Sequence, residues 1–226
     1  MPSITRIPER RKALIHAAEA ALKPTPKAKI PVTARGRATL RRILNAAEVE
    51  FGEKGYHDAS VSSITVRANV GQGTFYLYFN TKEEVFISLV RNIEHTLRSR
   101  AAELRAKSST RMELERRRIE AFSQFSMSHP HLFRIVQEAQ FVAPNLHREF
   151  YERLATAFGT GLNQAAADGD LTPGDGETRA WALIGISHFL GLRHSLWQKK
   201  TPDPAEIDEV MRFISDGIAP KKSNAK

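Results

Sequence analysis

Residues 70–79, VGQGTFYLYF, constrain the fold more than any other stretch of this sequence. The stretch holds two glycines and a run of aromatic and leucine residues, and none of its ten residues is charged. As a buried strand it would carry GQG in its middle, and no segment elsewhere in the sequence offers a partner strand. The stretch therefore predicts a short helix that follows a sharp turn.

The helical spacing of apolar residues predicts an all-α fold. Leu40, Leu44 and Phe51 recur at helical intervals, which indicates a first helix over about residues 36–54. Ser60 is placed to cap a second, short helix, and Asn69 stands where the chain must leave it in a left-handed conformation. Further helices are predicted at about residues 82–107, 110–128, 131–142, 144–168, 177–197 and 203–217.

Two of these helices begin with a capping-box signature. Thr81 is followed three residues later by Glu84, and Thr110 by Glu113. In this pattern the hydroxyl and the carboxylate each accept a hydrogen bond from a backbone N–H of the first turn. The signatures predict well-defined helix starts at residues 82 and 111.

Composition excludes several classes of protein. With 226 residues, of which 41% are hydrophobic, the chain is long enough for a real core. It contains no cysteine, which excludes disulfides, thiol nucleophiles and thiolate metal sites. No segment approaches the ~20 consecutive apolar residues of a membrane helix, and the first residues lack the apolar core of a signal peptide. We expect a cytoplasmic protein without membrane contact.

The positive charge is concentrated at the N-terminal end. The first 42 residues hold eleven Lys and Arg against two Glu, which equals the net charge of +9 of the whole chain. Such an end is typical of a surface that docks on nucleic acid or an acidic membrane, and also of a solubilising tail. Residues 1–33 form a basic extension with a possible short helix and a linker, which either packs as an extra helix, follows DNA as a basic arm or is mobile in the free protein.

Two short helices joined by a tight turn, behind a longer helix, form the arrangement of a helix-turn-helix DNA-binding protein. Residues 55–86, GYHDASVSSITVRANVGQGTFYLYFNTKEEVF, resemble the DNA-binding domain of the TetR family of bacterial transcriptional regulators. Two residues depart from the family pattern, Asn69 in place of glycine and Thr65 in place of alanine. Both are compatible with the motif, because asparagine tolerates the turn and the threonine hydroxyl can bond a carbonyl one turn earlier.

The resemblance implies an N-terminal three-helix DNA-binding domain, residues 34–81, followed by a larger helical effector-binding and dimerisation domain, residues 82–218, and a basic tail, residues 219–226. Base edges in the major groove are recognised by hydrogen bonds and methyl contacts more than by bulk charge, which explains an uncharged recognition helix. Phe75 and Phe79 are expected to face inward. The predicted DNA contacts are Arg35, Arg37, Ser60, Ser62, Gln72, Gly73, Thr74, Tyr76, Tyr78 and Lys82.

The remaining helices are expected to dimerise and to enclose a pocket for a small effector. The apolar face of residues 177–197 is too broad for one monomer's core and predicts a dimer interface that includes Ile184, Gly185, Phe189, Leu192 and Leu196. Effector candidates, each of which also suits ordinary core, are Phe122, Phe125, Phe133, Gln137, Phe141, Phe158, Trp181 and His188. Three arginines, Arg134, Arg148 and Arg153, either meet a phosphate or carboxylate or face water.

Neither a metal nor another cofactor is expected. The HPH run at residues 129–131 lacks a nearby acid and is more typical of a helix break than of a metal site. No catalytic motif occurs, so we do not expect an enzyme. The sequence predicts a homodimeric repressor that binds operator DNA and is released by a small hydrophobic or acyl/aromatic effector. The alternative is a constitutive regulator or a DNA-compacting protein without an effector.

Overall fold

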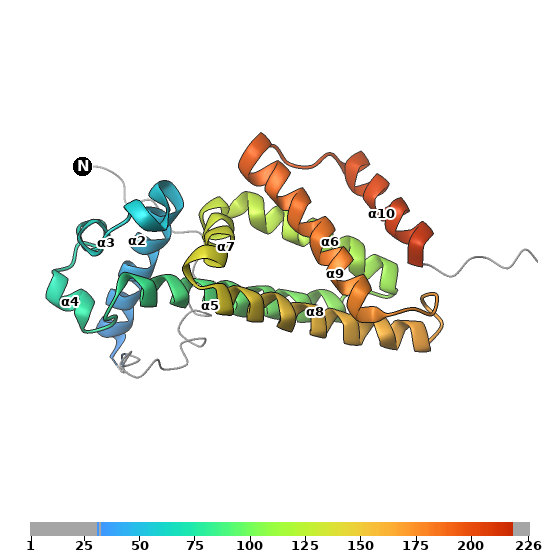
Figure 1. Ribbon diagram of the computed structural model, residues 1–226, viewed down its shortest axis with the longest axis horizontal. Helices are drawn as coiled ribbons and strands as arrows, with labels where there is room; N and C mark the ends of the chain where they lie inside the picture. The colour runs from blue at the N-terminus through green and yellow to red at the C-terminus, as the bar shows by residue number, and fades with distance from the viewer. Residues whose placement is uncertain (1–30, 32, 219–226) are drawn as a thin grey trace, which may run out of the picture. The chain divides into compact units, whose positions relative to one another are not determined.

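The computed structural model describes residues 31 and 33–218, and every regular element in this part of the chain is a helix (Figure 1). The all-α prediction is confirmed. The chain forms two compact units: unit 1 holds the described residues up to Ser99 together with His131–His147, and unit 2 holds Arg100–Pro130 and the residues from Arg148 onward. The predicted short helix and linker before residue 31, and the basic tail from residue 219, lie outside the described residues.

Unit 1 contains the helices that the sequence assigned to DNA binding. They are α2 (Ala34–Asp58), α3 (Val61–Ala68) and α4 (Gln72–Tyr76), and Figure 1 shows them grouped near the start of α5 (Lys82–Ala106). Most of α7 (Pro130–Val142) also belongs to this unit. Fully buried phenylalanines, Phe51, Phe75 and Phe86, form the centre of its core. The short helix predicted within residues 70–79 is observed at Gln72–Tyr76, and the inward orientation of Phe75 and Phe79 is confirmed.

Hydroxyl side chains start these helices, as their positions predict. Ser60 caps α3 in a reciprocal box with Ser63. Thr81 Oγ1 accepts from the backbone N–H of Glu84 at 3.1 Å, but the Glu84 carboxylate accepts from the N–H of Asn80, one residue before the cap, at 2.7 Å. Thr110, Glu113 and Ser109 repeat this shifted arrangement at the start of α6. Each carboxylate thus accepts a hydrogen bond from the residue that precedes the N-cap, Asn80 or Ser109.

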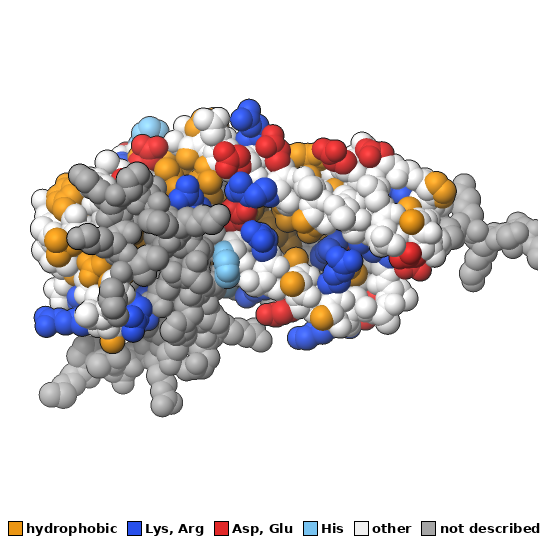
Figure 2. All heavy atoms as spheres, turned by 90° about the horizontal axis from the view of Figure 1, so that it is seen from below, with side chains coloured by type: hydrophobic (Ala, Val, Ile, Leu, Met, Phe, Trp, Pro, Cys, Tyr) orange, Lys and Arg blue, Asp and Glu red, His pale blue; other side chains and the backbone are white. Residues whose placement is uncertain are grey.

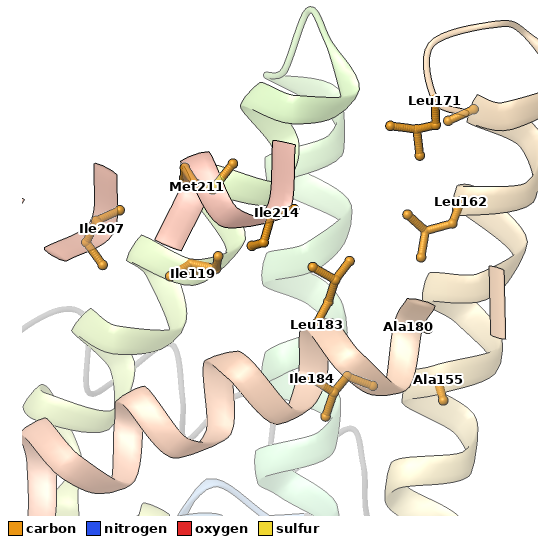
Figure 3. Close-up of a cluster of buried hydrophobic side chains, with 11 residues drawn as sticks. Ile119, Ala155, Leu162, Leu171, Ala180, Leu183, Ile184, Ile207, Met211 and Ile214 are labelled. Atoms are coloured by element: carbon orange, nitrogen blue, oxygen red, sulfur yellow. The ribbon is translucent and has the colours of Figure 1, made fainter. Parts of the chain in front are cut away.

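Unit 2 consists of α6 (Arg111–Ser128), α8 (Pro144–Ala167, from Arg148 onward), α9 (Gly176–Gly191), a π-helical segment η1 (Leu192–Gln198) and α10 (Pro204–Ile218). Its core joins Ile119 of α6, Leu162 of α8, Ile184 of α9 and Ile214 of α10 (Figure 3). The predicted single helix over residues 177–197 therefore changes to wider π-helical turns at Leu192 and ends at Lys199, which has a left-handed conformation with φ 50°. No described helix combines the length and the apolar composition needed to cross a bilayer.

Candidate nucleic-acid interface

The turn between α3 and α4 is formed by a left-handed asparagine. Asn69 has φ 51° and ψ 54°, and its N–H bonds the carbonyls of Thr65 and Val66. The next residue, Val70, donates to the Thr65 carbonyl at 3.0 Å. The Thr65 hydroxyl bonds the Ser62 carbonyl at 2.9 Å. Both departures from the family pattern thus adopt the local geometry that the sequence predicted for them.

The outer face of α4 is open. Gln72 and Gly73 are exposed, and Tyr76 is 53% exposed, whereas Phe75 on the opposite face is completely buried. A Cβ added at Gly71 or Gly73 would meet no atom of the described residues within 4 Å, and neither glycine has a positive φ. Packing within the described chain therefore does not require glycine at either position. The bare backbone leaves room for another molecule to approach closely.

Beside this turn lies an open hollow of about 500 Å³, between the start of α2 and the α3–α4 turn. Tyr78 closes one side, where its hydroxyl donates to the Gly36 carbonyl at 3.2 Å. Arg42 reaches the Asn69 carbonyl at 3.4 Å. None of the described residues that line the hollow is acidic; they are Thr33, Arg35, Gly36, Thr39, Arg42, Asn69, Val70, Gly71, Thr74 and Tyr78. Guanidinium and hydroxyl donors of this kind suit a phosphate group.

Lys82 has a different environment from the one the sequence suggested. Its ammonium donates to the carbonyls of Tyr56 at 2.6 Å, Ala59 at 2.7 Å and His57 at 3.2 Å. It also lies 4.3 Å from the centroid of the Tyr56 ring. An ammonium has three donors, so a phosphate contact by Lys82 would require it to exchange one of these carbonyls. The lysine holds the end of α2 and its capping residue, Ala59, to the start of α5.

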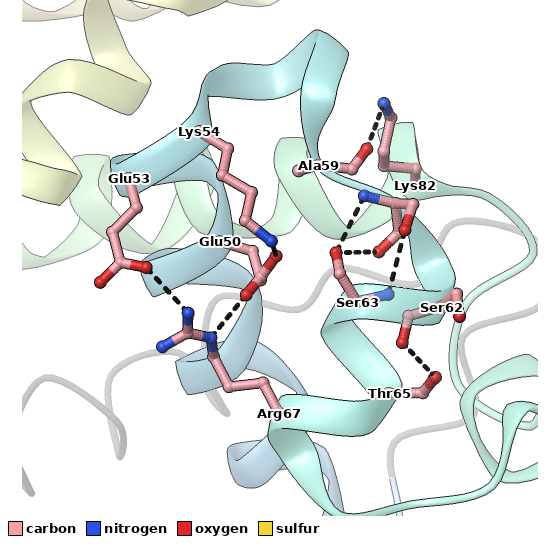
Figure 4. A network of polar contacts seen from close by, with 10 residues as sticks. Glu50, Glu53, Lys54, Ala59, Ser62, Ser63, Thr65, Arg67 and Lys82 are labelled. Carbon is pink, nitrogen blue, oxygen red and sulfur yellow. Dashed lines mark hydrogen bonds and ion pairs between the residues drawn. The ribbon is translucent and has the colours of Figure 1, made fainter.

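A second polar network joins α2 to α3. We call it the Glu50 network; it comprises Glu50, Glu53, Lys54 and Arg67 (Figure 4). Glu50 is only 2% exposed, and its two carboxylate oxygens are bound separately, by Lys54 at 2.7 Å and by Arg67 at 2.6 Å. Burial alone would raise the pKa of Glu50, but hydrogen bonds from Lys54, Ser63 and Arg67 lower it to about 2. The carboxylate is therefore ionised at neutral pH and fixes the angle between the two helices.

Helix α7 stabilises the far end of α2. The helix breaks at Gly55, where φ is 83°, and the following N–H, of Tyr56, donates to Glu138 of α7 at 2.7 Å. Arg134 of α7 donates to the carbonyls of Gly52 at 3.0 Å and Glu53 at 3.3 Å. One side chain thus accepts from a free N–H and the other donates to free carbonyls, which are the groups that a helix end leaves unpaired. The sequence assigned Arg134 to an anion or to water, and did not reveal these contacts.

The other predicted DNA contacts lie on the same unit. Arg35, Ser60 and Ser62 are exposed, Arg37 and Thr74 are partly buried, and all five belong to α2, α3, α4 or the residue that caps α3. Thr33 and Thr39 join Arg35, Arg42 and Thr74 in the lining of the hollow, and these two threonines were absent from the predicted set. The signal for Thr33 was its place just before the first helix, where it caps α2 with a hydrogen bond of 3.1 Å from Gly36.

The effector candidates fall in both units. In unit 2, Tyr151 joins two of them, because its hydroxyl lies 3.0 Å from Nδ1 of His188 and its ring stacks on Trp181 at 6.5 Å. Burial raises the pKa of Tyr151 to about 12. Phe125 is buried and Phe122 and Phe158 are partly buried in the same unit. In unit 1, Phe133 is buried, Gln137 is partly buried and Phe141 is exposed.

The residues predicted for the dimer interface differ in exposure. Ile184 lies in the hydrophobic core of unit 2, whereas Phe189 is 64% exposed. A Cβ at Gly185 would meet nothing among the described residues, and Leu192 and Leu196 are partly buried. Two exposed aromatic residues on nearby elements, Trp197 of η1 and Phe213 of α10, were not in the predicted set.

The histidines of the HPH run have packing roles. His129 stacks on Phe125 with ring centroids 5.0 Å apart, and His131 packs against Gly52 of α2. Among the described residues there is no group of three or more His, Cys, Asp or Glu side chains placed to hold a metal ion.

An open recognition helix, a left-handed turn and a supporting helix define the class: a helix-turn-helix protein. Residues 43–89 match the profile described as bacterial regulatory proteins, tetR family. An uncharacterised HTH-type transcriptional regulator of Bacillus subtilis is 29% identical over 201 residues, which cover 85% of this chain and 98% of that protein. The fatty acid metabolism regulator protein of the same organism is 44% identical over 55 residues, 24% of this chain and 28% of that protein.

Solved structures agree on the fold. The TetR-family regulator of Syntrophomonas wolfei has a TM-score of 0.67 at 20% identity, over 77% of this chain and 92% of that one. The fatty acid degradation regulator of Bacillus halodurans has a TM-score of 0.68 at 21% identity, over 85% and 96% of the two chains. The match of residues 43–89 assigns the DNA-binding region to the TetR family, and the comparisons together indicate a DNA-binding transcriptional regulator.

Proposed function

We propose that this regulator is a homodimeric cytoplasmic repressor, which binds operator DNA through α3 and α4 and releases it when a small hydrophobic or acyl/aromatic effector binds. The observation that carries the DNA-binding part is the outer face of α4. Packing among the described residues does not require glycine at position 71 or 73, and the side chains of Gln72 and Tyr76 are exposed beside them. A helix of this kind can lie deep in the major groove, where an amide and a hydroxyl meet base edges.

The hollow beside α4 supports a division of roles. Arg35, Arg42 and Tyr78 surround it without a carboxylate among the described lining residues, so it suits the DNA backbone. Gln72, Thr74 and Tyr76 are then the base contacts, and Gly73 allows close approach. Arg37, Ser60, Ser62 and Lys82 remain proposed backbone contacts, with Lys82 exchanging one of its carbonyl partners.

Exposed aromatic residues support the dimer. Single exposed hydrophobic side chains are ordinary on protein surfaces, but unit 2 carries Trp181, Phe189, Trp197 and Phe213 on three consecutive elements. On the face that Figure 2 draws, acidic and basic side chains are interspersed. Burial of these aromatic side chains between two copies, with Gly185 and the partly buried Leu192 and Leu196, would form a twofold-symmetric dimer. A helix-turn-helix dimer binds two half-sites whose centres lie about one DNA turn apart or a multiple of it.

The effector part of the proposal is supported by two similar proteins that are named a fatty acid metabolism regulator and a fatty acid degradation regulator. The first aligns over only 28% of its length, and the second is 21% identical, so neither transfers its effector to this chain directly. Residues 82–218 remain the proposed effector-binding and dimerisation domain, and residues 34–81 the proposed DNA-binding domain.

The test begins with selection of a preferred duplex from a random pool, followed by anisotropy titrations at physiological salt. We expect the wild-type protein to prefer the selected duplex over random DNA by at least ~1,000-fold. Gln72→Ala should reduce that preference by about 1–3 kcal/mol, because it removes a bidentate contact to a base. Gln124→Ala, an exposed glutamine on α6, is the matched control and should change nothing. Selection without enrichment would favour the DNA-compacting alternative.

A further inference from the structure

Three ionisable side chains are buried or nearly buried on one face of α6. Arg111, Glu115 and Arg118 occupy positions i, i+4 and i+7, which share a face of a helix. Arg111 is 8% exposed, Glu115 is 2% exposed, and the Arg118 side chain is 12% exposed. This Arg111–Glu115–Arg118 cluster holds two positive charges and one negative charge inside unit 2. A buried charge without a counter-charge is strongly disfavoured, so the cluster is incomplete as it stands.

The geometry shows where the cluster is incomplete. Nη1 of Arg118 donates to Oε1 of Glu115 at 2.8 Å, and Nη2 of Arg111 lies 2.5 Å from the same oxygen. Both guanidinium groups therefore share one carboxylate oxygen. Nε of each arginine and Nη2 of Arg111 are buried without an aligned hydrogen-bond acceptor among the described residues. A guanidinium has five N–H donors in a planar fork, which matches the two oxygens of a carboxylate or phosphate.

The position of Arg111 adds a second reason to expect an anion. Arg111 is the first residue of α6, directly after the capping residue Thr110. A helix N-terminus carries a partial positive charge, so an arginine at this position is disfavoured unless a negative group is near. Glu113 in the same turn does not fill that role, because its carboxylate is bound by Arg117 and Ser109.

The charges around Arg118 also indicate an excess of positive charge at this cluster. The pKa of its guanidinium is lowered, first by burial and further by the charges of Arg111 and Arg105, while Glu115 acts in the opposite direction. Arginine remains protonated at neutral pH in spite of such a shift. The site therefore keeps an excess of positive charge that an anion would neutralise.

Helix α8 gives the site an apolar side. The guanidinium of Arg118 lies 4.2 Å from the centroid of the Phe158 ring. One turn later, Gly161 faces Arg111: a Cβ at this glycine would lie 2.9 Å from Nη1 of Arg111. Met112, Leu154 and Phe158 continue this surface into the hydrophobic core that contains Ile119 and Leu162. An anionic group at the arginines would thus be adjacent to apolar side chains.

We propose that Arg111 and Arg118 bind the carboxylate or phosphate of an amphiphilic effector whose apolar part packs beside Phe158. This inference rests on the proposed function, since it names the chemical class of the effector. It also explains why Gly161 stands opposite Arg111, because any side chain there would displace the guanidinium. Glu115 holds the two arginines in register for the incoming anion.

The test compares three probes with the same alkyl chain: decanoate, decyl phosphate and the neutral decanol. Calorimetric titration of the full-length wild-type protein should give a dissociation constant for at least one of the two anions about 10–100-fold below that of decanol, the gain expected from charge-assisted hydrogen bonds. The stronger anion identifies the carboxylate or the phosphate as the recognised group. Arg118→Gln should abolish the preference for the anion. Arg117→Gln, at a partly exposed arginine on the same helix, should retain it.

Stability provides a readout that does not depend on the ligand. Arg118→Gln leaves one arginine for one glutamate, so it should leave the midpoint of urea unfolding unchanged or raise it. A purely structural arginine would lower the midpoint when replaced. The inference is overturned if the three probes bind equally, if none binds, or if Arg118→Gln keeps the preference for the anion.

Release of the selected duplex separates this inference from the proposed function. Release by decanol as effective as release by the anions would support an effector response and overturn the anion site. Binding of an anion that depends on Arg118 but does not release DNA would support the site and contradict the repressor mechanism.

Discussion

The two units each bury a glutamate, and they neutralise it in opposite ways. In the Glu50 network of unit 1, each carboxylate oxygen has its own cation, and the side chains of Lys54 and Arg67 are 45% and 38% exposed, so their remaining donors reach water. In unit 2, two buried arginines share one oxygen of Glu115. A complete network fixes the angle between two helices of the proposed DNA-binding domain. The Arg111–Glu115–Arg118 cluster has an excess positive charge that an anionic ligand would neutralise. We infer that the balanced network has a structural role and the unbalanced cluster a ligand-binding role.

The largest effect should come from Glu115→Gln. It leaves two buried arginines without any negative partner, and breaking a buried ion pair in this way costs about 3–5 kcal/mol. The free energy of unfolding from urea titration measures the loss. Glu113→Gln removes a more exposed carboxylate from the same helix and should cost much less. Equal losses of unfolding free energy in the two variants would contradict a greater cost for leaving the buried arginines unpaired.

Glu50→Gln should have the next largest effect and lower the free energy of unfolding by about 2 kcal/mol. The effect is smaller because its two partners, Lys54 and Arg67, are partly exposed and remain hydrated without it. The pKa of Glu50 in the folded protein, about 2, lies below the ordinary value of 4.5. Its contribution to stability is therefore complete above about pH 4.5 and is lost as the pH falls towards 2. Thermal unfolding from pH 7 to pH 2 should show a shallower decline in Glu50→Gln than in the wild type. Glu53→Gln, at the exposed end of the network, should keep the wild-type slope.

Lys82→Met tests how much the three carbonyl contacts of Lys82 stabilise unit 1. Loss of hydrogen bonds to three carbonyls should reduce the free energy of unfolding by about 1–3 kcal/mol. If Lys82 also contacts a phosphate, the slope of log affinity against log salt should fall by ~1. Lys107→Met, at an exposed lysine directly after α5, is the control for both measurements. An unchanged stability would show that the carbonyl contacts contribute little.

Gly73→Ala should have the smallest effect on stability and an opposite effect on DNA binding. Alanine in a helix is favoured over glycine by about 0.5–1 kcal/mol, and nothing described in the chain obstructs the added methyl group. Thermal unfolding should shift slightly upward, while affinity for the selected duplex should fall. Gly217→Ala on α10, which is equally unobstructed, should leave DNA affinity unchanged. Full affinity in Gly73→Ala would contradict close approach of DNA to this backbone.

Local features of the chain were predictable from sequence because short-range chemistry determines them. Ser60 and Asn69 begin and end α3 as predicted, and apolar spacing with caps and turn residues located the described α-helices to within a few residues. The π-helical segment η1 was not predicted. The features that sequence did not reveal depend on distant residues. Glu138 meets the N–H of Tyr56 across 82 positions, and a charged residue in a helical pattern gives no sign that it is buried. Glu50, Arg111 and Glu115 were overlooked for that reason.

The proposed repressor releases DNA only if effector binding and operator binding weaken each other, and calorimetry tests this coupling most directly. Binding of the preferred anionic probe is measured with and without a saturating amount of the selected operator. Release of DNA by ~100-fold corresponds to a coupling free energy of about 2.7 kcal/mol, and linkage makes it reciprocal. We expect the operator to weaken binding of the probe by the same ~100-fold. Equal affinities with and without operator would contradict the account and favour a constitutive regulator.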